Sequence, residues 1–372
     1  MSTIEEMGIK KLGFGLMRLP QHEDKTIDIK QTADMADAFL AAGMNYFDTA
    51  YVYEGSEEAI KKALVERHPR DNYFMADKLN VRVAKSADEA KKQFETSLER
   101  TGAGYFDLYL MHALSRDITP KFEEYGLWEF AKELRAQGKI RHLGFSFHDK
   151  PDLLKELLEQ HPEVEFVQLQ LNYADWESLT VCSRENYELC RQYGKPVIVM
   201  EPVRGGALAK PIPQIANAIE PILNGASPAS IAIRFAASLE GVITVLSGMS
   251  DMAQMQDNLS YMKEFKPLTD HEKEILAQVQ DVIKGLDQIP CTACRYCTAG
   301  CPVKINIPGV FGAMNRYKIF GSLENAKRGY KYNTSGNNGL ASSCIACGQC
   351  EMQCPQHIEI IKELQEVAAV LE

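Results

Sequence analysis

The sequence predicts a (β/α)8 barrel followed by a small, mostly helical domain rich in cysteine. Three observations lead to this fold class. Eight short apolar segments lie between residues 12 and 246, and amphipathic helical patterns separate them. Such an alternation of strands and helices implies a parallel sheet. The composition then changes, and eight of the ten cysteines lie after residue 290.

The elements of the barrel follow in order along the chain. The strand candidates are Leu12–Met17, Asn45–Asp48, Tyr73–Ala76, Asp107–Met111, His142–Ser146, Phe166–Leu171, Val197–Met200 and Val242–Leu246. The clearest helical patterns are Ile27–Ala42, Ala87–Arg100, Leu127–Gln137 and Pro151–Gln160. An open doubly wound sheet is the alternative. It is disfavoured because no G-x-G-x-x-G motif follows an early strand, and because eight strand–helix units in about 250 residues match a closed barrel.

The change in character after the barrel sets a domain boundary. The helical segment Asp270–Leu286 leads out of the barrel. We therefore expect a barrel over residues 1–285 and a second domain over residues 286–372. Within the second domain, Gly309–Arg328 and Ile358–Leu371 have helical patterns.

Composition and charge exclude two classes of partner. The 372 residues are 45% hydrophobic and 25% charged, with a formal net charge of −10. A chain this acidic lacks the general electrostatic footprint of a nucleic-acid-binding protein. No apolar run approaches the roughly 20 residues of a membrane-spanning helix, and the N-terminus lacks the apolar core of a secretory signal. We therefore expect a cytoplasmic protein with no nucleic-acid partner and no membrane span.

Two copies of one cysteine motif, C-x2-C-x2-C-x3-C-P, lie in the second domain. Three closely spaced thiolates suit three irons of a cubane cluster, and the fourth cysteine, before the proline, typically binds the other cluster. We therefore expect two 4Fe-4S clusters with crossed ligands. Cluster 1 takes Cys291, Cys294, Cys297 and Cys354, and cluster 2 takes Cys344, Cys347, Cys350 and Cys301.

Two structural zinc sites are the alternative interpretation of these cysteines. It is disfavoured because zinc sites usually pair two C-x2-C units and do not use four cysteines in one run with a trailing proline. With 42 residues between Cys301 and Cys344, the domain resembles the helical type of dicluster ferredoxin. The remaining Cys182 and Cys190 are expected to be reduced core residues.

The segment between the two motifs is basic. Residues 302–343 contain six basic side chains against one acidic side chain. These cations either balance the negative charge of the clusters or form a docking surface for an acidic electron carrier, and we favour charge balance.

Four titratable residues fall where predicted barrel strands end or just beyond, which is where this fold places its active sites. They are Asp48, Tyr53, Lys78 and His112. The ammonium of Lys78 would lower the pKa of Tyr53, Asp48 would hold Lys78, and a histidine can donate to a carbonyl oxygen. This set suits carbonyl reduction, in which hydride reaches carbon while the tyrosine gives oxygen a proton.

Each of these residues also has a purely structural explanation. Taken alone, Asp48 could cap the N-terminus of a helix, and Lys78 could be its ion-pair partner. His112 could be a buried core histidine with its hydrogen bonds satisfied. Their grouping at successive strand ends favours the catalytic interpretation.

At this point the sequence resembles the aldo-keto reductases over most of residues 9–266. The resemblance rests on KLGFGLMRLP, DTAYVYEGSEE, DKL, LYLMH and GKIRHLGFS. It implies that Tyr53 is the general acid, that Lys78 and Asp48 tune it, and that His112 orients the substrate carbonyl. The chain as a whole resembles a ferredoxin-bearing branch of this family.

The resemblance also implies a nicotinamide cofactor, NADPH or NADH. Ser146 and Gln168 match the residues that hold the nicotinamide amide, but Phe147 replaces the usual asparagine. Met200 stands where a stacking tyrosine is usual, and Asn258 would face the adenine. Cations for a 2′-phosphate are missing from the loop after the eighth strand. The nearby cations, one loop earlier, are Arg204 and Lys210.

Three functions are compatible with this combination of domains. The favoured one is a nicotinamide-dependent reductase of an aldehyde or ketone, or the reverse alcohol dehydrogenase, whose clusters serve electron transfer, redox sensing or docking. In the second, a ferredoxin-linked oxidoreductase, the clusters deliver electrons to or from the barrel and a ferredoxin- or flavodoxin-type protein is the redox partner. In the third, the barrel is an inactive scaffold for an electron-transfer module. The complete set of four titratable residues argues against the third.

Overall fold

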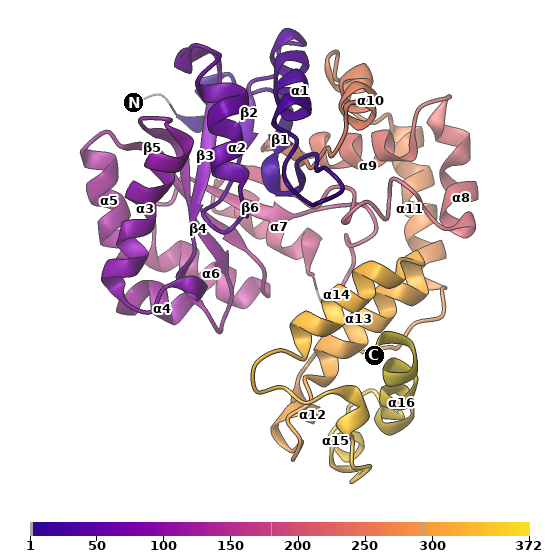
Figure 1. Cartoon of the computed structure of the whole chain (residues 1–372). Helices are drawn as coiled ribbons and strands as arrows, with labels where there is room; N and C mark the ends of the chain where they lie inside the picture. The colour runs from indigo at the N-terminus through magenta and orange to yellow at the C-terminus, as the bar shows by residue number, and fades with distance from the viewer. Residues whose placement is uncertain (1–2, 180, 292) are drawn as a thin grey trace. The chain divides into compact units, whose positions relative to one another are not determined.

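The computed structural model describes residues 3–179, 181–291 and 293–372 and contains the expected closed barrel (Figure 1). All eight strands are parallel, each pairs with the next in sequence, and β8 closes the sheet onto β1. The strands are β1 (Leu12–Gly15), β2 (Tyr46–Asp48), β3 (Phe74–Leu79), β4 (Phe106–Leu114), β5 (Ile140–Phe147), β6 (Phe166–Gln170), β7 (Val197–Met200) and β8 (Val242–Ser247). The prediction of a barrel is confirmed, and the doubly wound alternative is wrong.

Helices separate successive strands, as the amphipathic patterns predict, and two more, α10 and α11, follow β8. They are α1 (Ile29–Ala41), α2 (Ser56–Ile60), α3 (Ala87–Thr101), α4 (Thr119–Glu124), α5 (Leu127–Ala136), α6 (Pro151–Gln160), α7 (Ser183–Gln192), α8 (Pro213–Leu223), α9 (Pro228–Ala237), α10 (Met252–Met262) and α11 (Asp270–Lys284). Several begin at a side-chain cap that accepts an orphan backbone N–H, for example Ser86 before α3 and Asp251 before α10. Among the described residues, no helix is both long and apolar enough to cross a membrane.

The barrel buries two apolar layers. The larger one lies between strands and helices and includes the ring cluster of Phe14, Phe39 and Phe47. The smaller one includes Phe166 and other side chains such as Tyr46, Ala76 and Leu108. A Cβ at Gly144 would lie 2.5 Å from the Phe166 ring. Glycine is therefore required at this position, because the ring occupies the space of any side chain.

A local irregularity shapes the end of β4. The pairing of β4 with β5 shifts register between Met111 and Leu114. Ala113 takes a positive φ of 60°, which costs a non-glycine residue roughly 1–2 kcal/mol. Its N–H is held by the Ser146 hydroxyl oxygen at 2.7 Å. A bulge next to His112 therefore interrupts the regular strand at the end where the candidate site lies.

The chain divides into two compact units, and each unit is made of three separate segments of the sequence. The first unit contains Met1–Trp176, Val181–Val203 and Gly225–Asp270. The second contains Glu177–Thr180, Arg204–Asn224 and His271–Glu372. The second unit therefore takes α8 and most of α11 in addition to the cysteine-rich region. The domain boundary between residues 285 and 286 stays a prediction.

The cysteine-rich region folds around a core of its own. Its helices are α12 (Tyr296–Ala299), α13 (Ile307–Phe320), α14 (Leu323–Asn333), α15 (Gln349–Met352) and α16 (Ile360–Leu371). Phe311 and Met314 of α13 and Leu364 of α16 are central in this core. The helical pattern predicted over Gly309–Arg328 is two helices, because Gly321 adopts a φ of +66° and ends α13.

Candidate active site and cluster sites

Lys78 is the centre of a cluster of buried polar side chains inside the barrel. It lies on β3 with only 1% of its surface exposed. Its Nζ atom donates to the Asp48 Oδ1 atom at 2.5 Å and to the Thr49 carbonyl oxygen at 2.7 Å. Burial alone lowers the pKa of Lys78, but the Asp48 carboxylate and Tyr53 outweigh it and raise the pKa above its usual value. Lys78 and Asp48 therefore form a buried ion pair.

Tyr53 lies beside this ion pair, in the loop after β2. The Lys78 Nζ atom is 5.0 Å from the centre of the Tyr53 ring. Burial raises the pKa of Tyr53, and the opposing effect of Lys78 is smaller, so the net shift is upward. The sequence argument expected the opposite direction, because it weighed the neighbouring ammonium and not the loss of water. Tyr53 is thus a neutral phenol, the form that can give up a proton.

His112 completes the group from β4. Its ring meets the Tyr53 ring edge-on, with centroids 5.8 Å apart and planes at 82°. Its Nδ1 atom lies 3.3 Å from the Asn80 Nδ2 atom. The pKa of His112 lies well below its usual value, chiefly because the ring is buried. Lys78, His148 and Arg82 lower it further. The structure therefore brings all four predicted residues together, with His112 as a neutral imidazole.

Gln168 connects to this group from β6. Its Nε2 atom donates to the Asp48 Oδ2 atom at 3.2 Å, so both oxygens of Asp48 have donors. Ser146, on the neighbouring β5, accepts from the Ala113 N–H. Ser146 and Gln168, two of the predicted cofactor residues, therefore lie at the same end of the barrel as the four titratable residues.

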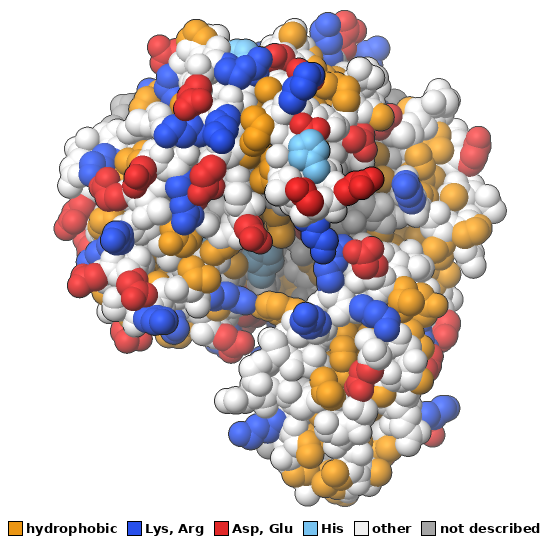
Figure 2. Space-filling model, in the orientation of Figure 1, with side chains coloured by type: hydrophobic (Ala, Val, Ile, Leu, Met, Phe, Trp, Pro, Cys, Tyr) orange, Lys and Arg blue, Asp and Glu red, His pale blue; other side chains and the backbone are white. Residues whose placement is uncertain are grey.

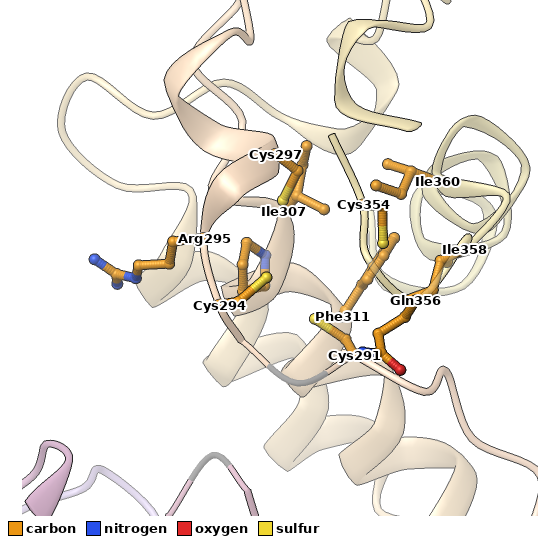
Figure 3. Close-up of a pocket in the computed structure, with 11 residues that line it drawn as sticks. Cys291, Cys294, Arg295, Cys297, Ile307, Phe311, Cys354, Gln356, Ile358 and Ile360 are labelled. Carbon is orange, nitrogen blue, oxygen red and sulfur yellow. The ribbon is translucent and has the colours of Figure 1, made fainter. Parts of the chain in front are cut away.

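The eight motif cysteines line two separate pockets in the second unit. One pocket contains Cys291, Cys294, Cys297 and Cys354, with Phe311 and Ile358 among its apolar lining (Figure 3). The other contains Cys301, Cys344, Cys347 and Cys350. Each pocket thus combines three cysteines of one motif with the fourth cysteine of the other.

The chemistry of these pockets fits a thiolate-bound cluster. The remaining lining is mostly apolar, and Ile307 contributes to both pockets. Burial raises the pKa of Cys297 to about 12, so its sulfur needs a nearby positive ion to become a thiolate. Among the described residues, no three His, Cys, Asp or Glu side chains converge as one metal ion would require.

Comparison with known sequences decides the family. The sequence model described as the aldo/keto reductase family matches residues 11–281 of this chain. The chain belongs to the aldo/keto reductase family. A second model, described as a 4Fe-4S dicluster domain, matches residues 290–359. A barrel of the aldo/keto reductase family therefore precedes a 4Fe-4S dicluster domain in this chain.

Individual relatives are distant. An aldo-keto reductase of Strobilurus tenacellus is 29% identical over 210 residues, which are 54% of this chain and 57% of that protein. The L-galactose dehydrogenase of Arabidopsis thaliana is 24% identical over 301 residues, 76% of this chain and 92% of that protein. An aldo-keto reductase of Mycobacterium avium is matched over only 51% of its length. The chain thus spans little more than half the length of several curated relatives.

Solved structures agree on the fold. The holo form of an aldo-keto reductase from Bacillus halodurans superposes with a TM-score of 0.58 at 25% identity, covering 72% of this chain and 91% of that one. An aldo/keto reductase from Klebsiella pneumoniae in complex with NADP and acetate gives a TM-score of 0.60 at 21% identity, covering 73% and 92%. Both cover about the share of this chain that its barrel occupies.

Of the two departures from the usual aldo/keto reductase pattern, Phe147 has a structural explanation and Met200 has none. Phe147 is 2% exposed and packs on Phe145 in the layer between strands and helices. A side chain buried there has no polar group to offer a nicotinamide amide. Met200 ends β7 and is half-buried.

The remaining cofactor candidates are engaged elsewhere in this structure. Asn258, on α10, donates to the Ser247 hydroxyl at 2.6 Å and accepts from the Tyr261 hydroxyl at 2.5 Å. Arg204 belongs to the second compact unit, where its guanidinium lies 3.8 Å from the centre of the Phe320 ring. The structure thus groups Arg204 with the second unit and not with the other candidates, and its role stays a prediction.

Sequence analysis did not identify three polar residues near the site. Arg18 pairs with Glu201 at 3.3 Å, and its charge acts to lower the pKa of Tyr53. Asn80 contacts His112. All three residues follow within three positions of a strand end (β1, β7 and β3), so a search of every such position could have found them.

Proposed function

We propose that the barrel catalyses nicotinamide-dependent reduction of an aldehyde or ketone, or the reverse oxidation of an alcohol, with Tyr53 as general acid/base. One observation carries this proposal. A neutral tyrosine lies against a buried Lys78–Asp48 ion pair and beside a neutral histidine, His112. This arrangement provides a proton donor, a cation to stabilise the anion that remains, and a second hydrogen-bonding group.

The residues divide the work as follows. A nicotinamide supplies hydride to the carbonyl carbon when it is bound. The Tyr53 hydroxyl gives its proton to the carbonyl oxygen, and the O–H electron pair stays on the tyrosine. The Lys78 ammonium then stabilises the phenolate, and Asp48 keeps Lys78 charged. His112 orients the carbonyl oxygen.

Ser146 and Gln168 are the residues that we propose hold the nicotinamide amide, with Met200 against the ring. Gln168 already reaches Asp48, so its amide can connect the cofactor to the four titratable residues. We keep Asn258 at the adenine and Arg204 near a 2′-phosphate as proposals. Titration with NADPH and with NADH in parallel distinguishes the two cofactors.

We propose that residues 286–372 carry two 4Fe-4S clusters with crossed ligands. The first set is Cys291, Cys294, Cys297 and Cys354, and the second is Cys301, Cys344, Cys347 and Cys350. The grouping of the thiols in two mostly apolar pockets supports this assignment. The thiolates require a reducing compartment, which supports a cytoplasmic location. Eight irons and eight sulfides per chain are expected by chemical analysis, and zinc in their place would contradict the proposal.

A redox partner of the ferredoxin or flavodoxin type is proposed for the clusters. Cys294 and Cys347 are exposed, so an edge of each pocket reaches the surface. Ile345 and Met352, which flank the second pocket's cysteines, are 61% and 78% exposed. Figure 2 shows hydrophobic side chains gathered at the end of this unit that carries α12 and α15. Exposed apolar side chains at a redox centre suit transient docking of another protein.

The second candidate function is a ferredoxin-linked oxidoreductase, in which the clusters deliver electrons to or from the barrel. The burial of Phe147 favours it, because the usual asparagine contact to the nicotinamide is missing. The double variant Cys344→Ser, Cys347→Ser distinguishes the two functions. Under the second function these substitutions stop turnover even with NADPH present, whereas a self-sufficient reductase keeps activity.

The experiment that tests the proposal is an anaerobic titration of cluster-containing protein with NADPH and NADH, without and then with a panel of aldehydes and ketones. We expect nicotinamide oxidation only when a carbonyl is present, while the cluster absorption stays unchanged. Tyr53→Phe is expected to abolish this oxidation, and Tyr51→Phe in the same loop is the matched control. Bleaching of the clusters in the absence of any carbonyl would favour the ferredoxin-linked function, and an unaffected Tyr53→Phe variant would exclude Tyr53 as the acid.

A further inference from the structure

Asn80 is held rigidly just beyond the end of β3. Its backbone N–H donates to the Gln93 Oε1 atom at 2.9 Å, and its carbonyl oxygen accepts from the Gln93 Nε2 atom at 2.8 Å. Both residues are buried, at 6% and 3% exposure. The Gln93 side chain from α3 therefore fixes both backbone groups of Asn80. The orientation of the Gln93 amide is also set, because its oxygen faces a donor and its nitrogen faces an acceptor.

The side chain of Asn80 is oriented by a second contact. Its Oδ1 atom accepts from the Arg82 backbone N–H at 2.9 Å, in the turn Val81–Val83. A backbone N–H can only donate, so the oxygen of the amide must be the atom that faces it. The amide nitrogen is then the atom that faces the His112 Nδ1 atom, at 3.3 Å.

This contact determines which nitrogen of His112 carries the proton. An amide NH2 group only donates, so the Nδ1 atom must accept and be unprotonated. A neutral imidazole has one proton, which is then on Nε2. Burial of the ring, together with Lys78 on β3, His148 after β5 and Arg82 in the turn after β3, lowers the pKa of His112 and so opposes a second proton.

We propose that Asn80 is a positioning residue that holds His112 in its Nε2–H tautomer, so that the ring presents a hydrogen-bond donor to the substrate. The Arg82 N–H fixes the orientation of the Asn80 amide, the amide NH2 requires an unprotonated Nδ1 atom, and the single proton of the neutral ring is then on Nε2. The use of the donor for a carbonyl oxygen rests on the proposed function. The tautomer does not, because it follows from contacts within the protein.

The tautomer can be measured without substrate. Nitrogen-15 NMR of protein labelled at histidine distinguishes the two ring nitrogens, and the signal that disappears in His112→Gln assigns the residue. For the full-length, cluster-containing chain we expect an Nε2–H ring at neutral pH. A proton on Nδ1 in the unmodified protein would overturn the proposal at once, whatever the enzymatic activity.

The variant Asn80→Asp tests the cause. One carboxylate oxygen still accepts from the Arg82 N–H, but the other now accepts from His112, which places a proton on Nδ1. Carbonyl reduction is expected to fall about 100-fold, the usual effect of removing one oxyanion donor, and to become pH-dependent. Asn45→Asp, at a polar contact to Gly8 and Lys10, is the control that leaves the tautomer unchanged.

Failure of this inference and failure of the proposed function give different results. An Nε2–H tautomer that Asn80→Asp converts to Nδ1–H supports the inference even if no carbonyl is reduced. An unchanged tautomer in folded Asn80→Asp overturns it even if reductase activity is found. Asn80→Ala, which removes the contact without offering an acceptor, is expected to give a mixture of tautomers. A ring that stays purely Nε2–H in that variant would show that Asn80 is not needed.

Discussion

The two sites of this protein are organised in opposite ways. At the candidate active site of the barrel, polar side chains have protein partners: Lys78 has Asp48, Asp48 also has Gln168, and His112 has Asn80. In the second unit, eight thiols surround two mostly apolar pockets. The barrel site is therefore ordered by the chain itself, whereas the cysteine sites are completed by the groups they bind. We therefore expect the two halves to respond differently to loss of cofactor and to single substitutions.

The largest effect is expected from removal of iron. Anaerobic chelation should unfold residues 286–372, because cluster binding contributes directly to folding where ligands alone line an apolar pocket. The barrel should keep its fold. Calorimetry with hydrogen-exchange mass spectrometry checks this, and protection lost equally in β1–β8 would show that the two halves are not organised differently.

The next largest effect is expected at the buried ion pair. Lys78→Met leaves the Asp48 charge buried without its partner, which typically costs about 3–5 kcal/mol of unfolding free energy. Lys30→Met is the matched control, since Lys30 pairs with Asp34 on an exposed helix surface and its loss should have little effect. Urea unfolding measures both. If the double variant Asp48→Asn, Lys78→Met were no more stable than Lys78→Met, the buried charge would not be the cause.

A smaller effect is expected in the barrel interior. Gly144→Ala places a methyl group against the Phe166 ring and should destabilise the protein by about 1–3 kcal/mol. Gly312→Ala in α13 has no atom within 4 Å of the added group and should be neutral or stabilising by up to about 1 kcal/mol. Thermal unfolding of each variant compares them, and equal shifts would contradict the packing argument.

The smallest effect is a change in pH dependence. Asp77 Oδ2 and Glu57 Oε1 are buried with no hydrogen-bond partner in the described part of the chain. Burial, with the Glu57 charge second, raises the pKa of Asp77 well above its usual 3.8. The folded protein thus keeps a proton that the unfolded chain releases, so stability falls as pH rises from about 4 towards the folded pKa.

Asp77→Asn should remove part of this fall, because an amide NH2 replaces the protonated carboxyl and its oxygen can still accept from the Lys78 N–H. Unfolding free energies from pH 4 to pH 8 test this. Stability curves that stay parallel for the two proteins would mean that Asp77 is ionised in the folded state.

The sequence predicted the barrel well because its strands have a strong and regular apolar pattern. The four titratable residues were found for the same reason, since their positions follow from where the strands end. The bulge at Ala113 was not predicted, because it depends on a tertiary contact to Ser146. The end of α13 at Gly321 follows a local glycine signal that the helical pattern masked.

The direction of the Tyr53 pKa shift could not be derived from sequence. It depends on how much water the folded barrel excludes, which no spacing of residues reveals. The contact of Gln168 with Asp48 likewise joins residues 120 positions apart. The sequence places both near one end of the barrel but does not show which atoms meet.

Ile307 lines both cysteine pockets, so the two proposed clusters would have a neighbouring side chain in common. Electron tunnelling decays steeply with distance, so two clusters that share a neighbour would exchange electrons with each other readily. The two clusters would therefore act together as one electron store, which takes up and releases two electrons in total, one at a time. A hydride also carries two electrons, so under the proposed function the capacity of this store would equal the demand of one turnover in the barrel.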